Sequence, residues 1–182
     1  MQYKQLWKFY KPMPQIILKI NHDTDKIHEN NNICCYILES ELSDSTINKV
    51  ISIGKPVLFD GKNAINKINV LGDGIIINID SRKPLKAQVR PIREKIGTKK
   101  IIGTVIDPSR HEAMLASETE PEFVAFRVSE HNFDKAKELI EWYNELFLIQ
   151  CAVQPETFFS GLKELDVDFL IINSQNFDDF SC

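Results

Sequence analysis

Short runs of apolar, β-branched residues recur along the chain, and stretches with helical character follow them. The run Ile101–Ile106 is of this kind, and it is typical of a strand buried on both faces. Beyond Ser109, residues 113–116 supply good helix formers. Phe123 then begins another apolar run directly after Pro121 and Glu122. This part of the chain is therefore predicted to read strand, helix, strand.

The same alternation extends over most of the chain. Because strands that alternate with helices are joined by right-handed crossovers, the sheet is expected to be parallel. The predicted strands are Gln15–Leu18, Ile33–Ile37, Pro56–Phe59, Gly74–Ile77, Ile101–Ile106, the run that begins at Phe123, Phe147–Cys151 and Leu170–Ile172. The predicted helices are Asn63–Val70, Pro84–Ile96, one after Ser109, one capped by Asp134 and Pro155–Leu165.

The number of predicted strands decides the fold class. Eight strands favour an α/β protein with a closed (β/α)₈ TIM barrel, although 182 residues are few for a fold that typically takes about 250. The shortfall predicts a trimmed barrel, with a short first helix around Asp23–His28 and no last helix after Ser174. We expect one domain over residues 1–182, with peripheral segments at 1–13 and 176–182.

An acidic residue stands directly before several predicted strands, at GDGIII, PEFVAF and VDFLII. These residues are Asp73, Glu122 and Asp168, which lie 49 and 46 residues apart. Such a spacing is the length of two strand–helix units, so it predicts an internal repeat.

Composition limits the classes of partner. The apolar fraction of 43%, the charged fraction of 26% and the net charge of −4 are ordinary for a globular protein, and they argue against nucleic acid as a partner. No apolar run approaches the ~18 residues that cross a bilayer, so no membrane partner is expected. The early prolines and aromatics are unlike a signal peptide, which favours a cytoplasmic location with reduced cysteines.

In a TIM barrel the carboxyl ends of the strands surround the functional face. Asp60 and Asp80 follow neighbouring strands, where two carboxylates could hold Mg²⁺, or could be solvated acids of caps and turns. Asp107 and Arg127 also end neighbouring strands. Arg127 could bind a phosphate or carboxylate with both nitrogens, or pair with Asp107 across the barrel mouth.

The first residues of the chain carry Trp7, Phe9 and Tyr10, an apolar set for an exposed tail. Packing over the bottom of the barrel, or against a second subunit, would bury these rings.

Three stretches resemble one protein family. They are PVLFDGKNAINKINVLGDGIII, IIGTVIDPSRHEAMLASETEPEFVAF and LFLIQCAVQPETFFSGLKELDVDFLIINS. Over about Ile33 to Ser174 the chain resembles the thiamine-phosphate synthase and TenI-like barrels of the alphaproteobacterial type. The resemblance implies the barrel fold and a homodimer. It also implies a reaction in which a pyrimidine pyrophosphate ionises and a thiazole phosphate nitrogen attacks the cation.

That reaction needs Mg²⁺ and basic side chains to hold the departing pyrophosphate. The chain departs from the family pattern at those places: Tyr36–Ser40 lacks the basic groups after the second strand, and Phe126–Glu130 lacks the threonine pair and lysine after the sixth. Cys151 and Ala152 replace the two glycines of the seventh strand. The residues expected to bind a small phosphorylated or otherwise anionic ligand are Lys62, Asp107, Arg127, Gln150, Asn173 and Ser174.

Three functional hypotheses follow. The first is a thiamine-phosphate-synthase-like barrel without the classical synthase activity, which binds a small anionic ligand or has no catalytic role. The second is an active synthase, a transferase, with a rearranged site built from Asp60, Lys62, Asp80 and Arg127. The third is a protein-interaction module whose mouth is closed by Asp107 and Arg127.

Overall fold

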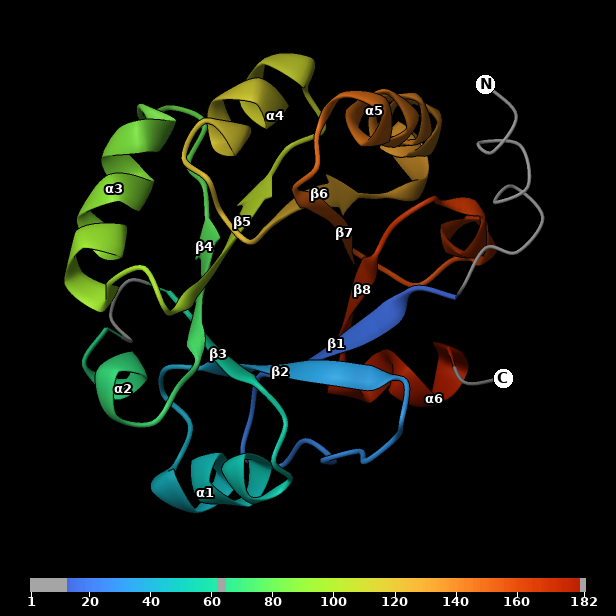
Figure 1. Cartoon of the computed structure of the whole chain (residues 1–182). Helices are drawn as coiled ribbons and strands as arrows, with labels where there is room; N and C mark the ends of the chain where they lie inside the picture. The colour runs from blue at the N-terminus through green and yellow to red at the C-terminus, as the bar shows by residue number, and fades with distance from the viewer. Residues whose placement is uncertain (1–12, 62–64, 181–182) are drawn as a thin grey trace, which may run out of the picture.

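The chain forms a closed barrel of eight parallel strands, in which sequence neighbours pair and β8 closes against β1. This architecture is seen in a computed structural model that describes residues 13–61 and 65–180. Figure 1 shows the strands as a ring with α1 to α5 around it. The predicted TIM barrel is confirmed. Its strands are β1 Gln15–Ile20, β2 Ile33–Glu39, β3 Val57–Asp60, β4 Gly74–Asn78, β5 Ile101–Ile106, β6 Phe123–Val128, β7 Gln150–Pro155 and β8 Phe169–Asn173.

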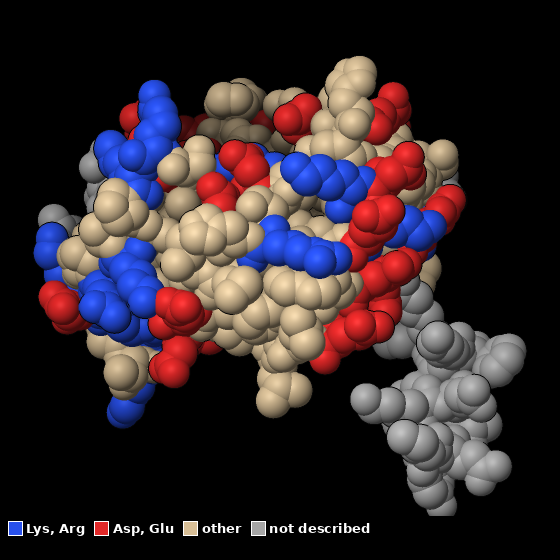
Figure 2. All heavy atoms as spheres, turned by 90° about the horizontal axis from the view of Figure 1, so that it is seen from above, with Lys and Arg blue, Asp and Glu red and all other residues tan. Residues whose placement is uncertain are grey.

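The helices cover the outside of the strands. They are α1 Asp44–Ser52, α2 Ile65–Val70, α3 Leu85–Ile96, α4 Arg110–Ser117, α5 Phe133–Leu146 and α6 Phe177–Phe180, with short 3₁₀ turns at Glu130–Asn132, Ser160–Glu164 and Ser174–Asn176. The helix α1 was not among the predicted elements. No described helix has both the length and the apolarity that a membrane span requires. On the face that Figure 2 shows, basic side chains are densest at the left and acidic side chains at the right, with both kinds present on each side.

The barrel is trimmed, but not quite as predicted. Residues 21–32 contain no helix, so the short first helix expected at Asp23–His28 is wrong. The last helix is not missing but shortened to α6. Phe177 of α6 is buried and its ring lies 4.5 Å from the His28 ring. Helix α6 therefore packs on the connection that stands where the first helix was expected.

The strands separate two apolar cores. The larger core lies between the strands and the helices, and the smaller one fills the barrel interior. Near the amino end of the interior, the Phe123 and Phe169 rings meet edge to face at 5.9 Å. Gly103 makes room for them, because a Cβ on it would lie 2.1 Å from the Phe123 ring. The barrel is thus a packed core rather than a pore.

The seventh strand begins later than predicted. The apolar run predicts a strand from Phe147, but the Phe147 ring stacks on Tyr143 of α5 at 4.7 Å, and Leu148 is fully exposed. The first residue of β7 is Gln150, which pairs with Phe123. Because the strand runs on to Pro155, the helix predicted over 155–165 is reduced to the 3₁₀ turn at 160–164.

The repeated acids have one structural role at the amino ends of the strands. Each carboxylate accepts a backbone N–H from a residue at the start of the preceding strand, and the acid's own N–H donates to the carbonyl of that same residue. We call these pairs the acid clamps: Asp73 with Val57 (2.9 and 2.8 Å), Glu122 with Ile102 (2.6 and 2.9 Å) and Asp168 with Cys151 (2.8 and 2.9 Å). The repeat in the sequence is therefore a repeat in structure.

Candidate functional site

A ring of polar side chains surrounds the carboxyl end of the barrel interior. Each strand contributes at least one residue to the interior apolar core, and side chains two positions apart on a strand point the same way. The interior core residues nearest the carboxyl ends of the strands are Ile17, Ile37, Leu58, Ile76, Val105, Ala125, Ala152 and Ile171. Two positions further on stand the residues that we call the mouth ring: Lys19, Glu39, Asp60, Asn78, Asp107, Arg127, Gln154 and Asn173.

Lys19 is the centre of one half of the mouth ring. Its Nζ lies 2.6 Å from Asp60 Oδ2 and 2.9 Å from Glu39 Oε1. The Lys19 and Asp60 side chains are only 14% and 10% exposed. Burial opposes the charge on Lys19, but the hydrogen bonds and charges of Asp60 and Glu39 raise its pKa above the usual value. Lys19 is thus a cation held by two carboxylates.

Asn78 links that half of the mouth ring to the other. Its Nδ2 donates to Asp60 Oδ1 at 3.1 Å, and its Oδ1 accepts from an Arg127 nitrogen at 3.3 Å. The second terminal nitrogen of Arg127 donates to Asp107 Oδ1 at 2.9 Å. The predicted pairing of Arg127 with Asp107 is therefore present. A continuous chain of contacts crosses the mouth from Glu39 to Asp107.

The charges of the mouth ring do not favour an anion. Its cations are Lys19 and Arg127, its carboxylates are Glu39, Asp60 and Asp107, and its other members are amides. Both cations already contact a carboxylate. With two cations and three carboxylates, the mouth ring carries a net charge of 2 − 3 = −1, which disfavours an anion.

The residues that follow β8 hold the first connection rather than an open pocket. Asn173 Oδ1 accepts from Asn21 Nδ2 at 3.1 Å. Ser174 is 2% exposed, and its hydroxyl donates to the Lys26 carbonyl. The next side chain, Gln175, donates to Asp25 at 3.1 Å. Both predicted ligand-binding residues, Asn173 and Ser174, are thus engaged by residues 21–26.

Asp80 lies outside the mouth ring, two residues beyond Asn78. Its carboxylate accepts from two Arg82 nitrogens at 2.8 and 3.1 Å, which lowers the pKa of Asp80 to about 2. The carboxylate of Asp60, by contrast, is taken by Lys19 and Asn78. Each acid already has its own cation, and within residues 13–61 and 65–180 no group of three His, Cys, Asp or Glu side chains could hold a metal ion. The described residues do not fit the Mg²⁺ site expected at Asp60 and Asp80.

The structure brings some predicted residues together and separates others. Asp60, Asp107 and Arg127 join through Asn78. Gln150 was expected at the mouth, but it is the first residue of β7 and lies at the opposite, amino end of the barrel. The residue of β7 in the mouth ring is instead Gln154. Lys62 lies outside the described residues.

Half of the mouth ring was missed: Lys19, Glu39, Asn78 and Gln154. The sequence contains a pattern that identifies these residues. On every strand an inward apolar residue is followed by one residue that faces the helices and then by a polar residue. Counting two positions beyond the inner apolar residue of each strand would have found all of them.

No family model matches the chain. The thiamine-phosphate synthase of Erythrobacter litoralis (strain HTCC2594) is 31% identical over 56% of this chain and 50% of that protein, so the chain spans about half the length of this relative. Tryptophan synthase from M. tuberculosis superposes with a TM-score of 0.64 at 11% identity, over 94% of this chain and 87% of that one. KGPDC from Streptococcus mutans superposes with a TM-score of 0.59 at 16% sequence identity, over 91% of this chain and 90% of that one. Orotidine 5'-monophosphate decarboxylase from Methanocaldococcus jannaschii superposes with a TM-score of 0.53 at 15% sequence identity, over 90% of this chain and 91% of that one. The structures share the fold, and the chain is a TIM barrel similar to thiamine-phosphate synthase.

Proposed function

We propose that this barrel is a relative of thiamine-phosphate synthase that does not carry out the coupling reaction, and that its own ion pairs close its mouth. The observation that carries this proposal is the chain of contacts from Glu39 through Lys19, Asp60, Asn78 and Arg127 to Asp107. Both cations of the mouth ring are neutralised within it.

The chemistry of the coupling reaction explains why this matters. A departing pyrophosphate develops negative charge, so a catalyst must present preorganised positive groups or backbone N–H donors that point at it. Here the cations are occupied, and the Asp60 and Asp80 carboxylates are engaged by Lys19 and Arg82 rather than left to coordinate a metal. Cys151 and Ala152, which replace the glycines of the resembling family, are buried inside β7.

The test combines genetics with ligand binding. The chain is expressed in a strain that lacks thiamine-phosphate synthase, and we expect no growth without added thiamine. Thermal unfolding of the purified protein should be unchanged by thiazole phosphate, and by pyrophosphate with Mg²⁺. A bound ligand at 100 times its Kd would stabilise the fold by about 2.7 kcal/mol, which is readily measured.

An isosteric variant supplies the matched control. Asp107→Asn keeps the size of the side chain but removes the charge that occupies Arg127. We expect pyrophosphate to stabilise this variant and not the natural protein. Growth of the deletion strain, or a shift of the natural protein with pyrophosphate and Mg²⁺, would instead support the active synthase with a rearranged site.

A further inference from the structure

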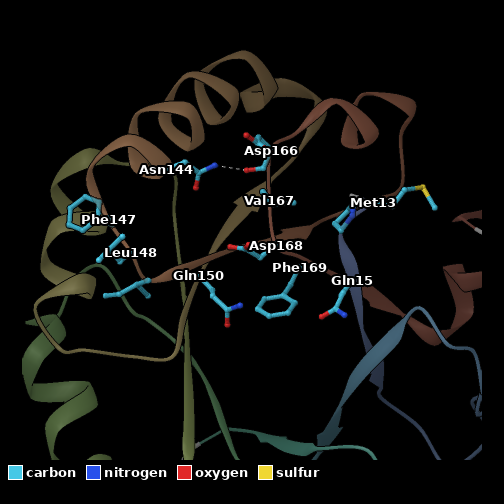
Figure 3. Close-up of a pocket in the computed structure, with 12 residues that line it drawn as sticks. Met13, Gln15, Asn144, Phe147, Leu148, Gln150, Asp166, Val167, Asp168 and Phe169 are labelled. Atoms are coloured by element: carbon cyan, nitrogen blue, oxygen red, sulfur yellow. Dashed lines mark hydrogen bonds between the residues drawn. The ribbon is translucent and has the colours of Figure 1, made fainter. Parts of the chain in front are cut away.

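A cavity of about 600 Å³ opens at the amino end of the barrel, on the opposite side from the mouth ring. Figure 3 shows its lining, which comes from the start of β1, the end of α5, the start of β7 and the residues before β8. Small-molecule sites in proteins have volumes of roughly 300–1,000 Å³. The cavity therefore has room for a small ligand, and it is separate from the site already described.

Three side chains form a row across the inner edge of this cavity. Gln15, Phe169 and Gln150 are the first residues of β1, β8 and β7, and β8 lies between the other two strands. Gln15 stands directly beside Phe169 in the register of the sheet. Figure 3 shows the Phe169 ring between the two glutamine side chains, with all three pointing the same way. Because neighbouring strands lie about 4.8 Å apart, the strands that carry the two glutamines are separated by about 10 Å.

The Phe169 ring is held in place from below. It meets the buried Phe123 ring edge to face at 5.9 Å, so the interior core fixes its position. Phe169 itself is only half-buried and lines the cavity. An aromatic ring that is fixed by the core and still reaches the surface offers a contact for a second flat ring.

The two glutamines leave their carboxamides available for a ligand. Both residues are exposed, and within residues 13–61 and 65–180 their side chains make no hydrogen bond. A carboxamide carries a donor and an acceptor side by side. Glutamine uses this pair of atoms to bind the edge of adenine, which presents an acceptor beside a donor. Gln15 and Gln150 can therefore bind a flat heterocycle at two of its edges.

The charges at the cavity favour a ligand without negative charge. Asp166 and Asp168 line it, whereas none of the described residues that line it is Lys, Arg or His. The Asp168 carboxylate already accepts the Cys151 N–H in its acid clamp. A phosphate or carboxylate in the cavity would lie near two acids and would find no cation there.

We propose that the amino end of this barrel binds a flat, uncharged nitrogen heterocycle of the class of a nucleobase or its nucleoside. The ring of the ligand packs on Phe169, and its polar edges hydrogen-bond with Gln15 and Gln150. This site lies at the end of the strands opposite the mouth ring. The proposal is therefore independent of the function proposed for the mouth.

Titration of the full-length protein with adenosine, guanosine, cytidine and uridine tests the proposal. We expect at least one of them to bind with a Kd of about 1 mM or below. In two-dimensional NMR spectra it should shift the backbone amide signals at the first residues of β1, β7 and β8. The 5'-monophosphate of the same nucleoside should bind more weakly, because its phosphate adds negative charge beside Asp166 and Asp168.

Matched variants of one strand locate the ligand. Gln150→Met keeps the length of the side chain and removes its hydrogen-bonding atoms, so we expect about tenfold weaker binding of the nucleoside. Gln154→Met makes the same change at the mouth end of β7 and should leave this affinity unchanged. Gln15→Met repeats the test on β1 and should weaken binding as Gln150→Met does.

Three results would overturn the proposal. One is the failure of all four nucleosides to bind at about 10 mM. The second is an affinity that Gln15→Met and Gln150→Met leave unchanged, or that Gln154→Met lowers instead, because the ligand would then lie elsewhere. The third is tighter binding of the monophosphate than of the nucleoside, since the cavity would then have to attract an anion.

Discussion

The two ends of this barrel hold their charged side chains in different ways. At the amino end, each acid clamp joins one carboxylate to one backbone residue of the preceding strand, and the clamps share no residue. At the carboxyl end, the contacts form one connected chain that involves β1 to β6. The first arrangement repeats a local device, whereas the second makes each charge depend on its neighbours.

This difference has an energetic consequence. Groups that lie far apart without shared partners contribute additively to the free energy of unfolding, whereas members of one network do not. The amino end should therefore behave as a set of independent contributions to stability. The mouth ring should behave as a unit: removing one charge should lower the free energy of unfolding more than removing both members of an ion pair.

The largest effect is expected for Lys19→Met. This change leaves the nearly buried Asp60 carboxylate without its cation, and breaking a buried pair costs about 3–5 kcal/mol. Asp60 keeps its hydrogen bond from Asn78, so we expect a loss near the lower limit. Urea unfolding of the natural protein and of the variant measures this loss in the free energy of unfolding.

The double variant Lys19→Met/Asp60→Asn tests whether the network is coupled. With the acid neutralised, no unpaired charge stays buried at Asp60, so the double variant should be more stable than Lys19→Met alone. If the double variant instead lost the sum of the two single losses, the mouth ring would be no more connected than the acid clamps.

The pH dependence of stability examines the same pair. The pKa of Lys19 is higher in the folded protein than in the unfolded chain, because the contributions of Asp60 and Glu39 outweigh that of burial. Its stabilising contribution is therefore complete below the unfolded pKa of about 10.4 and is lost as the pH rises through the folded pKa. Lys19→Met should remove this part of the alkaline loss of stability.

An intermediate effect is expected at the amino end. Asp168→Ala removes a carboxylate that accepts the Cys151 N–H at 2.8 Å. The acid is exposed, so water replaces part of this contact, and we expect a loss of about 1.5 kcal/mol. Asp73→Ala acts on a different strand pair, and combining the two changes should double the loss.

Asp168→Asn is the matched control for the clamp. The amide oxygen can still accept from Cys151, so this variant should retain part of the stability that Asp168→Ala loses. A combined Asp73 and Asp168 variant whose loss departed from the sum by more than about 0.5 kcal/mol would contradict the independence of the clamps.

The sequence predicts the bounds of some strands better than those of others, and the reason is physical. Strand β5 was predicted with its observed bounds, because its apolar residues all pack in one core or the other. For β7 the run Phe147–Ile149 looks the same locally, but pairing with β6 begins only at Gln150. That register places Gln150 at the amino end and Gln154 at the mouth.

The mouth ring was half found for a related reason. Residue chemistry alone favours Asp80 over Asn78 as a site residue. Asn78 has the inward register, whereas Asp80 lies in the loop, where it pairs with Arg82. The acid repeat could be seen in the sequence. Its role could not, because the backbone N–H that each acid accepts belongs to a residue at least 16 positions away.

The smallest effect is expected for the ion pair of Asp107 with Arg127. Their side chains are 56% and 27% exposed, and exposed ion pairs contribute about 0.2–1 kcal/mol. A double-mutant cycle of Asp107→Asn and Arg127→Gln should give a coupling energy within that range, and it should fall as salt is raised. The same cycle on Lys19 and Asp60 should give a larger coupling that salt hardly changes, because both groups are nearly buried. Equal coupling energies in the two cycles would mean that burial does not make the Lys19–Asp60 ion pair stronger than the Asp107–Arg127 ion pair. The Arg127 half would then be as hard to open to an anion as the Lys19 half.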